Sequence, residues 1–391
     1  MTVADPADSV RLPHSRRAAA ALTLATVTVY ADIYIPQPIL PLLSREFGVR
    51  PAAAGLTISV VVLMIALVSI PYGSLSDAVG RKPVMVTSLF LLAVPTLLCA
   101  AAPSYQALLV FRALQGALIP GVTAVAVAYL GDHFSAAELG PKVGGWIAAS
   151  VAGGLAGRVV SGLLADWWNW RAPFLLFGGL TVLGAAAIVR ELPRAGVRSP
   201  RLSLPSRDLL QHFSNRRLVG AFLIGGAVFF CFIGVFTYLP YYLTAAPFHL
   251  STAFVSSIYL VYVAGIFASI VSGRLSARFG ARPMMAVGLT ITGCAVAGTL
   301  VRSTPFIVAS LVVLCVGMFT VQSTAPAFVN ANARRAKGAA GALYVTFYYV
   351  GATFGSLLPG LAWQQWGWPG VAGTCATALA VGLAADAILC V

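Results

Sequence analysis

Three charged residues stand inside stretches of the sequence that are otherwise apolar: Asp32, Arg112 and Arg158. An ionised side chain at the centre of a bilayer costs about 2.5–3.5 kcal/mol on insertion scales, so such residues usually face a water-filled cavity or one another. An aspartate in that setting exchanges protons, and an arginine pairs with it or binds an anion. The three residues therefore predict proton coupling and solute binding inside a membrane. The alternative is a purely structural ion pair between Asp32 and an arginine.

Asp32 is the carboxylate placed deepest within an apolar stretch, which makes it the expected site of proton coupling. We expect protonation of Asp32 to release Arg112 and deprotonation to recapture it. Asp386, near the end of the last apolar stretch, is instead expected to extend toward the membrane surface.

The composition requires a membrane around these residues. Of the 391 residues, 59% are hydrophobic and 9% are charged, whereas a soluble domain carries about 25% charged residues. The net charge of +14 arises from short basic segments between apolar stretches, which argues against nucleic-acid binding. The six cysteines lie in apolar stretches without a C-x-x-C pair, so neither a disulfide framework, a metal site nor a cofactor is expected.

Apolar windows of about 20 residues, enough to cross the hydrocarbon core, predict an all-α polytopic membrane protein with twelve transmembrane helices. The first six expected spans are 18–43, 53–73, 84–102, 105–130, 143–165 and 172–189. The other six are 218–244, 253–273, 284–302, 306–330, 339–361 and 370–390. The expected domains are an N-terminal six-helix bundle over 1–189, a linker over 190–217 and a C-terminal six-helix bundle over 218–391.

The basic residues orient these spans. With both termini in the cytoplasm, 19 of the 25 Lys and Arg fall in the tail or in cytoplasmic connections, and four fall in outer connections. Cytoplasmic loops of membrane proteins carry such an excess. We therefore expect a multi-pass protein of the cytoplasmic (inner) membrane, with both termini and the 190–217 linker in the cytoplasm.

The chain repeats itself at a spacing close to 200 residues. Residues 73–85 read GSLSDAVGRKPVM and residues 273–285 read GRLSARFGARPMM, with Ala277 where the first copy has Asp77. A second pair, WNWRAP at 168–173 and WGWPGV at 366–371, joins the fifth and sixth spans of each half. Two matched connections in two sets of six spans are typical of a duplicated transporter.

These motifs resemble a known family. GSLSDAVGRK fits the G-x-L-x-D-x-x-G-R-K signature of the major facilitator superfamily, and RALQG at 112–116 resembles the fourth-span motif of its twelve-span drug–proton antiporter branch. Overall the chain looks most like bacterial arabinose-efflux-permease-type transporters. The resemblance implies two six-helix bundles around a central cavity that opens alternately to each side of the membrane.

The fifth span matches the antiporter motif of that branch in part. Its matching glycines are Gly144, Gly153, Gly157 and Gly162. The chain departs from the motif where Arg158 stands in place of a proline and Ser161 in place of a further glycine. The glycine spacing survives, so close packing of this helix against its neighbours is expected.

The loop after the second span is expected to be a cytoplasmic gating motif formed by Gly73, Asp77, Gly80, Arg81 and Lys82. Glycines permit close helix approach and a tight turn. The aspartate can accept hydrogen bonds or pair with an arginine. The alternative is ordinary turn chemistry combined with a topology signal.

Polar and aromatic side chains are expected to line the cavity. The candidates are Tyr30, Tyr34, Gln37, Gln115, Phe232, Phe236, Tyr238, Tyr259, Tyr262, Gln322, Tyr344 and Tyr348. Aromatic residues on buried helices most often pack together, but this number suits an amphipathic or sugar-like ligand. In span one, Asp32 points away from the face that carries Tyr30, Tyr34 and Gln37, unless Pro36, Pro38 and Pro41 interrupt the helix. Which face lines the cavity is left open.

The leading hypothesis is a secondary active transporter that exports a small organic solute, such as a sugar or amphipathic drug, in exchange for protons. One alternative is a carrier of a small organic anion, because the two arginines outnumber the one aspartate; another is a membrane sensor that does not transport. The apolar spans contain no H-E-x-x-H, G-x-S-x-G or Walker pattern, so neither an enzyme nor ATP-driven transport is expected. One chain provides both bundles, which favours a monomer in the lipid bilayer.

Overall fold

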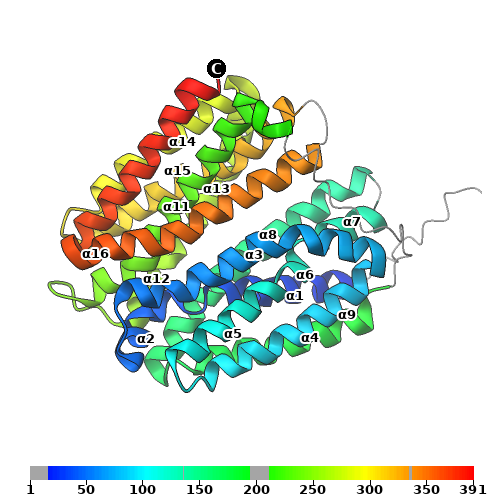
Figure 1. Ribbon diagram of the computed structural model, residues 1–391, viewed down its shortest axis with the longest axis horizontal. Coiled ribbons are helices and arrows are strands. Elements are labelled where there is room, and N and C mark those ends of the chain that lie inside the picture. The colour runs from blue at the N-terminus through cyan, green and yellow to red at the C-terminus, as the bar shows by residue number, and fades with distance from the viewer. Residues whose placement is uncertain (1–15, 135, 194–210, 334–336) are drawn as a thin grey trace, which may run out of the picture. The chain divides into compact units, whose positions relative to one another are not determined.

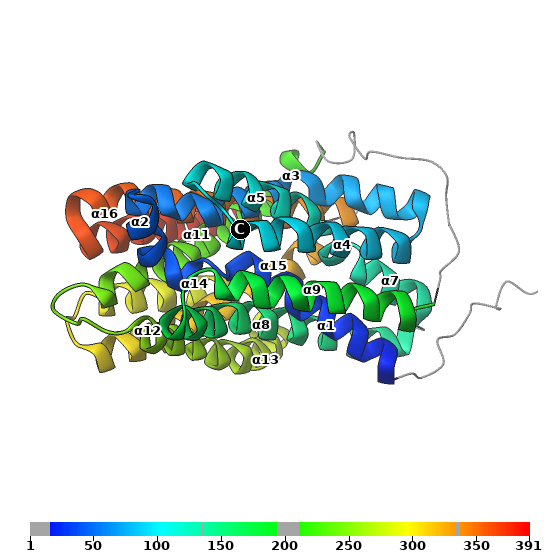
Figure 2. The ribbon, with the colours of Figure 1, turned by 90° about the horizontal axis from the view of Figure 1, so that it is seen from below.

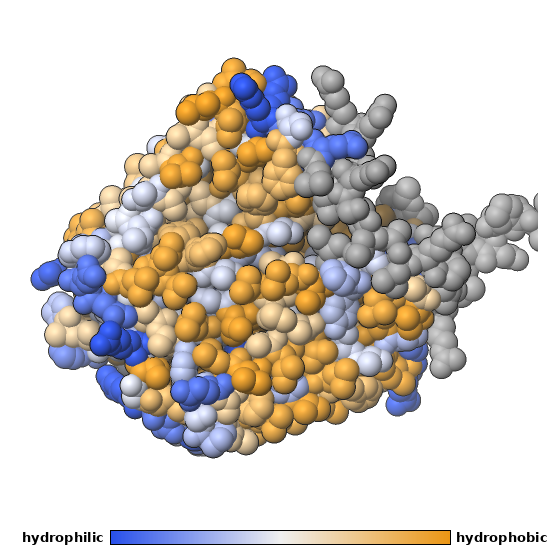
Figure 3. All heavy atoms as spheres, viewed as in Figure 1, coloured by the Kyte–Doolittle hydropathy of each residue, from blue (hydrophilic) through white to orange (hydrophobic). Residues whose placement is uncertain are grey.

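The structure is a computed structural model that describes residues 16–134, 136–193, 211–333 and 337–391, and these residues are largely helical (Figure 1). Within the described ranges, ten helical segments are long and apolar enough to cross a membrane. Large apolar side chains are exposed, Leu67 by 61%, Phe267 by 65% and Ile388 by 72%, and Figure 3 shows apolar side chains over much of one face. Such a surface suits lipid rather than water. The chain is therefore a multi-pass membrane protein, as predicted.

The final helix contains two of the expected spans. α16 (Lys337–Leu389) has 53 residues, a length of about 80 Å at the helical rise, against a hydrocarbon core of about 30 Å. Gly367 interrupts it with a φ of 59°, and Figure 1 shows that the ribbon doubles back between its orange and red parts. The expected ninth span corresponds to α14 (Ala281–Gly298), which has 18 residues.

Contacts divide the chain into two compact units. The first comprises Met1–Ile35, Leu67–Gly157 and Arg171–Leu204, and the second comprises Pro36–Ala66, Arg158–Trp170 and Pro205–Val391. Two helices, α3 (Pro51–Val79) and α8 (Ala136–Trp167), therefore contribute to both units. Most of the expected 190–217 linker, including residues 194–210, lies outside the described residues. The division into bundles over 1–189 and 218–391 stays a prediction.

In the first unit, α9 (Ala172–Glu191) packs against α1 (Arg16–Tyr34) and α4 (Arg81–Ala100), as Figure 2 shows. The expected fourth span consists of three helical pieces. These are α5 (Tyr105–Leu118), α6 (Pro120–Thr123) and α7 (Ala126–His133). Proline lacks the N–H that continues a helix, which accounts for the interruption at Pro120.

The glycines of α8 allow it to pack closely, as predicted. A methyl group on Gly153 would lie 2.4 Å from the carbonyl oxygen of Val27, and one on Gly157 would lie 2.5 Å from that of Ala31. Both contacts join α8 to α1 in the first unit. Gly162 makes a similar contact in the second unit. The prediction is wrong for Gly144, where a methyl group would meet no described atom within 4 Å.

The prolines of the first span interrupt it, which is the alternative that the sequence left open. α1 ends at Tyr34, a single 3₁₀ turn η1 (Gln37–Ile39) follows, and α2 (Leu40–Phe47) completes the span. Asp32 belongs to the first unit and Gln37 to the second. The interruption thus separates the two polar groups that a continuous helix would have placed on opposite faces.

In the second unit, α11 (Arg216–Thr244) packs along α16, and α15 (Thr304–Asn332) packs against α14 and α13 (Tyr262–Phe279). The expected eighth span consists of α12 (Thr252–Ile258), the 3₁₀ turn η3 (Tyr259–Val261) and α13. A further 3₁₀ turn, η2 (His212–Ser214), precedes α11.

Candidate functional site

The carboxyl group of Asp32 lies in the interior of the first unit, where the residue has no solvent exposure. Its Oδ2 accepts hydrogen bonds from Thr96 Oγ1 over 3.4 Å and from Thr181 Oγ1 over 3.3 Å. Its Oδ1 is buried and has no hydrogen-bond partner among the described residues. Three helices, α1, α4 and α9, therefore position one buried carboxyl group whose two oxygens have different surroundings.

Arg112 secures the end of the helix that carries Asp32. Its Nη1 donates to the main-chain oxygen of Asp32 and its Nη2 to that of Ile33, each over 2.7 Å. Helix ends leave such carbonyl groups without helical partners, and Pro36 has no N–H to bond the oxygen of Asp32. Arg112 thus lies beside Asp32 with its guanidinium bonded to the main chain of α1, and the coupling role of the two residues stays a prediction.

Gln115 connects Arg112 to the carboxyl group. Its Oε1 accepts from Arg112 Nη1 over 2.8 Å, and its Nε2 donates to Thr96 Oγ1 over 2.7 Å. Cys99 Sγ also lies 3.5 Å from Gln115 Oε1. The result is a buried network from Arg112 through Gln115 and Thr96 to Asp32, and we call it the Asp32 network.

The sequence did not identify Thr96 and Thr181 as members of this network. In an apolar helix a threonine usually bonds a carbonyl of its own helix, and both do so here. Thr96 Oγ1 lies 2.8 Å from Leu92 O, and Thr181 Oγ1 lies 2.8 Å from Phe177 O. Only the packing of α4 and α9 against α1 reveals their second role.

Arg158 belongs to the second unit, and it is buried, with 2% of the residue exposed. Its Nε donates to Gln37 Oε1 over 2.6 Å, and its Cζ lies 4.8 Å from the ring centre of Tyr262 and 5.6 Å from that of Tyr259. Gln37 Nε2 donates in turn to Thr237 Oγ1 over 3.0 Å. We call this chain of contacts from Arg158 through Gln37 to Thr237 the Gln37 bridge.

Two predicted cavity residues use their hydroxyl groups to hold the main chain. Tyr238 Oη donates to Ser356 O over 2.6 Å, and Tyr259 Oη donates to Phe236 O over 2.8 Å. Both tyrosines have no solvent exposure. They contribute to helix packing in the second unit, with Tyr259 also beneath the Arg158 guanidinium.

The remaining aromatic candidates of the second unit contact one another or Phe229, and one of them, Tyr262, lies beside Arg158. The ring centre of Tyr262 lies 5.0 Å from that of Phe232 and 4.8 Å from that of Phe236. Tyr348 stacks on Phe229 at 3.7 Å, and Tyr344 lies beside Tyr348.

The other candidates have different surroundings. Gln322 is exposed on α15, and Tyr30 packs edge-on against Trp146 in the first unit. Tyr34 is buried at the end of α1.

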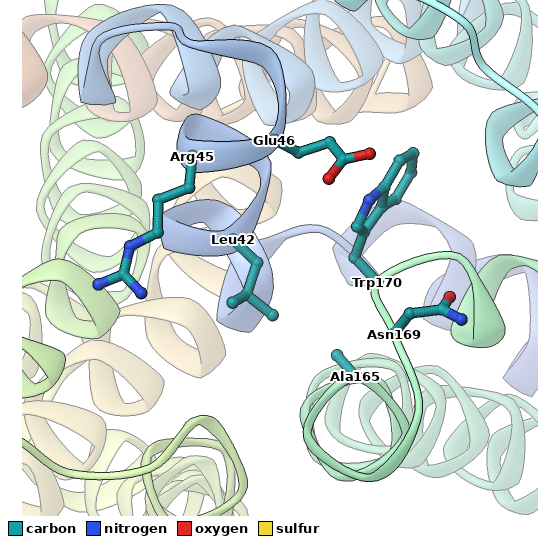
Figure 4. A pocket seen from close by; sticks show the side chains of 6 residues that line it. All are labelled: Leu42, Arg45, Glu46, Ala165, Asn169 and Trp170. Atoms are coloured by element: carbon teal, nitrogen blue, oxygen red, sulfur yellow. The ribbon is translucent and has the colours of Figure 1, made fainter.

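A small pocket of about 350 Å³ in the second unit is lined by other residues. Leu42, Arg45, Glu46, Ala165, Asn169 and Trp170 line it. Figure 4 shows the Glu46 carboxylate directed toward the Trp170 indole, whereas the Arg45 side chain extends away. Sequence analysis did not identify these residues. Neither the Asp32 network nor the Gln37 bridge lines this pocket.

The segment expected to be the gating motif forms the predicted turn and a cluster of charges. Gly80 adopts a φ of 104°, which a residue with a side chain rarely does. Arg81 Nη2 lies 2.5 Å from Asp77 Oδ1, and Arg81 Nε lies 3.2 Å from Asp132 Oδ2 on α7. Asp132 was not identified from the sequence. Gly73 is a correction: a methyl group there would meet no described atom within 4 Å, so close helix approach does not explain this glycine.

Lys82 and its counterpart in the second copy both contact the last helix of their halves. Lys82 Nζ donates to Val189 O over 2.7 Å. In the second copy, Gly280 repeats the turn with a φ of 91°, and Arg282 Nε lies 3.4 Å from Asp386 Oδ2. Asp386 is 7% exposed. The expectation that it extends to the membrane surface is therefore wrong, because Arg282 holds it against the protein.

Within the ranges that the structure describes, no group of three or more His, Cys, Asp or Glu side chains is arranged as a metal site. The chemistry that the described clusters offer is that of one buried carboxyl group, two buried guanidinium groups and their hydrogen-bonding neighbours.

Relatives of known sequence match nearly the whole chain. The inner membrane transport protein YnfM of Escherichia coli (strain K12) is 33% identical over 374 residues, which cover 95% of this chain and 90% of that protein. The uncharacterized MFS-type transporter YybF of Bacillus subtilis (strain 168) is 32% identical over 374 residues, covering 95% of this chain and 93% of that protein.

Solved structures share the fold at low sequence identity. A peptide transporter POT in complex with sulfate superposes with a TM-score of 0.80 at 14% identity, over 97% of this chain and 96% of that chain. A bacterial homolog of the human lysosomal transporter Spinster, inward-facing and unoccupied, gives a TM-score of 0.75 at 17% identity, over 96% and 95%. The family model described as Major Facilitator Superfamily matches residues 22–336 and 245–390. The predicted fold class is confirmed, and the chain is a membrane transporter that belongs to the major facilitator superfamily.

Proposed function

We propose that this protein exports a small organic solute in exchange for protons, and that Asp32 carries the coupled proton. The observation that supports this most directly is the buried carboxyl group of Asp32, held between two threonine hydroxyls and next to Arg112. A carrier of protons needs one group whose charge changes as the protein changes conformation. The chemistry of Asp32 suits that role.

The hydrogen bonds around Asp32 accommodate a neutral carboxyl group. A threonine hydroxyl has one proton to donate, and each threonine lies nearer to a carbonyl of its own helix than to Asp32. For Thr96 the two distances are 2.8 and 3.4 Å, and for Thr181 they are 2.8 and 3.3 Å. If the proton of either threonine points to the carbonyl of its own helix, the oxygen of that threonine can accept the single proton of a neutral Asp32. If the proton points to Asp32, the carboxylate accepts it instead.

The ionised form of Asp32 has a different source of stabilisation. Arg112 places a positive charge at the same end of α1, where it bonds the main-chain oxygen of Asp32. An opposite charge close by favours the carboxylate. Both protonation states are thus accommodated, and small changes in the packing of α1, α4 and α9 would shift the balance between them.

The gating motif and the membrane orientation complete this proposal. Asp77 and Arg81 bias the equilibrium between conformations from the cytoplasmic side, with both termini and the 190–217 linker also in the cytoplasm. The bacterial relative YnfM is named as an inner membrane protein, which supports the same location here. One chain acts as a monomer in the lipid bilayer.

A second candidate function, the transport of an organic anion, is supported by Arg158. This cation is 2% exposed and lies over two aromatic rings with an amide oxygen at its Nε. A guanidinium group binds carboxylates and phosphates well. The two functions are compatible, because an anion is also a solute that can move in exchange for protons.

The test uses purified protein in liposomes that contain a pH-sensitive dye. A solute that raises the midpoint of thermal unfolding is applied as a concentration gradient, and proton movement in the opposite direction is expected, with a protonophore abolishing the signal. Solute flux without proton movement would contradict proton coupling. Binding without any flux would instead indicate a membrane sensor.

A further inference from the structure

The guanidinium of Arg158 contacts an amide oxygen that a ligand could displace and aromatic rings on which a ligand could pack. An amide oxygen lies 2.6 Å from its Nε, and its Cζ lies over the rings of Tyr262 and Tyr259. A cation over aromatic rings gains about 0.5–2 kcal/mol. In a site shielded from water, an ion pair with bidentate hydrogen bonds is stronger than a hydrogen bond to an amide oxygen or a contact between a cation and an aromatic ring.

The described acidic residues of the second unit have other environments. Glu46 and Asp166 are exposed, and Asp386 lies 3.4 Å from Arg282. All three lie toward helix ends, whereas Arg158 is in the interior of α8. Arg158 thus places a buried positive charge beside the ring of Tyr262 and the amide of Gln37.

We propose that Arg158 binds the anionic group of the transported solute, and that this group displaces the side-chain oxygen of Gln37. The solute class is a carboxylate on a flat apolar or aromatic skeleton, because Tyr262 lies beside the guanidinium and Phe232 and Phe236 pack against Tyr262. This inference rests on the proposed transport function.

Displacement of Gln37 would also act on a second contact. Gln37 lies on η1 and its Nε2 donates to Thr237 Oγ1 on α11. When its Oε1 no longer bonds Arg158, the amide loses the partner that orients it toward Thr237. Gln37 is thus a positioning residue: it transmits occupation of Arg158 to the contact between η1 and α11.

The substitution Gln37→Glu tests the site without any solute, because it places a carboxylate where the amide oxygen bonds Arg158. At mildly alkaline pH we expect it to raise the midpoint of thermal unfolding by several degrees, since charge-assisted hydrogen bonds are about twice as strong as neutral ones. The gain should vanish when Arg158→Gln is also present. A midpoint below that of the wild type, or the same change with and without Arg158, would overturn the proposal.

Gln115→Glu is the matched control for this substitution. Gln115 Oε1 accepts from Arg112 Nη1 over 2.8 Å, which is the same chemistry, but Asp32 already supplies a carboxyl group to that network. No stabilisation is expected there. An equal rise for Gln115→Glu would show that a carboxylate beside any buried arginine stabilises the protein, and would overturn the specific claim for Arg158.

Ligand binding provides the second test, with benzoate, phenylacetate and succinate as probes and the neutral amide of each as its partner. We expect a saturable rise in the unfolding midpoint with an aromatic carboxylate, none with its amide, and loss of the effect in both Arg158→Gln and Gln37→Glu. Equal effects of acid and amide, an effect that persists in Arg158→Gln, or no effect of any of the acids would overturn the proposal.

The contact with Thr237 is tested separately. Thr237→Val removes the acceptor of the Gln37 amide, and Thr324→Val removes a buried hydroxyl that bonds only carbonyls of its own helix in the structure. We expect Thr237→Val to change the affinity for the stabilising acid by at least twofold, in either direction. Thr324→Val should leave this affinity unchanged. Equal affinities in both variants would contradict the positioning role of Gln37.

These experiments separate this inference from the proposed function. Proton-coupled flux of neutral solutes alone, with no acid bound at Arg158, would contradict this inference and leave the proposed function in place. Acid binding that requires Arg158, without solute-driven proton movement, would support the site and contradict proton coupling.

Discussion

Gln37 and Thr237 are 200 positions apart, and they hydrogen-bond each other over 3.0 Å. The same offset separates the two copies of the gating motif, at 73–85 and 273–285. Equivalent positions of the two chain halves therefore meet at this point. Contacts of a residue with its own equivalent are what a two-fold relation between similar halves produces.

A reciprocal pair of contacts supports the same relation. A methyl group on Gly360 would lie 2.8 Å from Ala52 Cα, and one on Gly162 would lie 3.2 Å from Thr252 O. Ala52 and Thr252 are 200 positions apart, and Gly162 and Gly360 are 198 apart. The close contact between α3 and α16 thus has a counterpart between α8 and α12, all within the second unit.

The packing of α8 on α1 gives a prediction about stability. Gly157→Ala should destabilise the protein by about 1–3 kcal/mol, because the added methyl group would lie 2.5 Å from Ala31 O. Gly144→Ala, in the same helix, adds its methyl group to open space and should leave stability unchanged or slightly higher. Thermal unfolding in detergent compares the two variants. Equal midpoints would contradict the close packing.

The contact of Arg112 with the end of α1 predicts that a positive charge at position 112 is not sufficient for full stability of the protein. Arg112→Lys keeps the positive charge but loses the planar group that bonds two carbonyl oxygens at once. We expect a loss of about 2 kcal/mol, the range for a hydrogen bond to a charged group. Arg302→Lys, at an exposed position, serves as the control. Wild-type stability of Arg112→Lys, with Arg112→Gln destabilised, would show that charge rather than geometry matters.

The gating motif predicts a defect in turnover without a defect in binding. Asp77→Asn removes the charge that contacts Arg81 over 2.5 Å, so it should shift the equilibrium between conformations and lower turnover several-fold. Solute affinity should stay within about twofold of wild type, because the shift acts through conformation rather than through the solute site. Asp166→Asn, at an exposed position on α8, is the control. Wild-type turnover of Asp77→Asn would reduce the motif to turn chemistry.

The distribution of basic residues predicts the orientation in the membrane. In a background without native cysteines, a cysteine at Ser199, outside the described residues, should react in intact cells only with a membrane-permeant reagent. A cysteine at Asn169, on the expected outer side, should react with an impermeant one. The reverse pattern would contradict the proposed location of both termini in the cytoplasm.

Much of the fold could be predicted because it depends on local chemistry. Long apolar windows predicted the helices, the prolines after Tyr34 indicated a possible interruption of the first span, and Gly80 predicted a tight turn. The partners of Arg112 could not be predicted, since two main-chain oxygens of α1 become available only after the helix has ended and α5 has packed beside it. Which side chains meet depends on the rotation and crossing of helices, and apolar sequences of nearly uniform hydrophobicity contain little information about either.

The same reasoning explains the errors at single residues. Asp386 was expected to reach the membrane surface because it lies near the end of its helix. Instead, its Oδ2 forms an ion pair with Arg282 Nε on α14 over 3.4 Å. Thr96 and Thr181 were overlooked because a threonine bonded to its own helix has the same sequence context as one that also reaches a neighbour. Tertiary packing determines these contacts in each case.

The central claim is that Asp32 carries the coupled proton, and flux through Asp32→Asn in proteoliposomes tests it most directly. The solute is one that raises the unfolding midpoint of the wild type, and flux is measured with and without an imposed proton gradient. Asp386→Asn is the control, because it alters another buried carboxyl group that contacts Arg282 outside the Asp32 network. We predict that Asp32→Asn still exchanges solute down its gradient but no longer concentrates it, whereas Asp386→Asn still does. Accumulation of solute against its gradient by Asp32→Asn would contradict the claim.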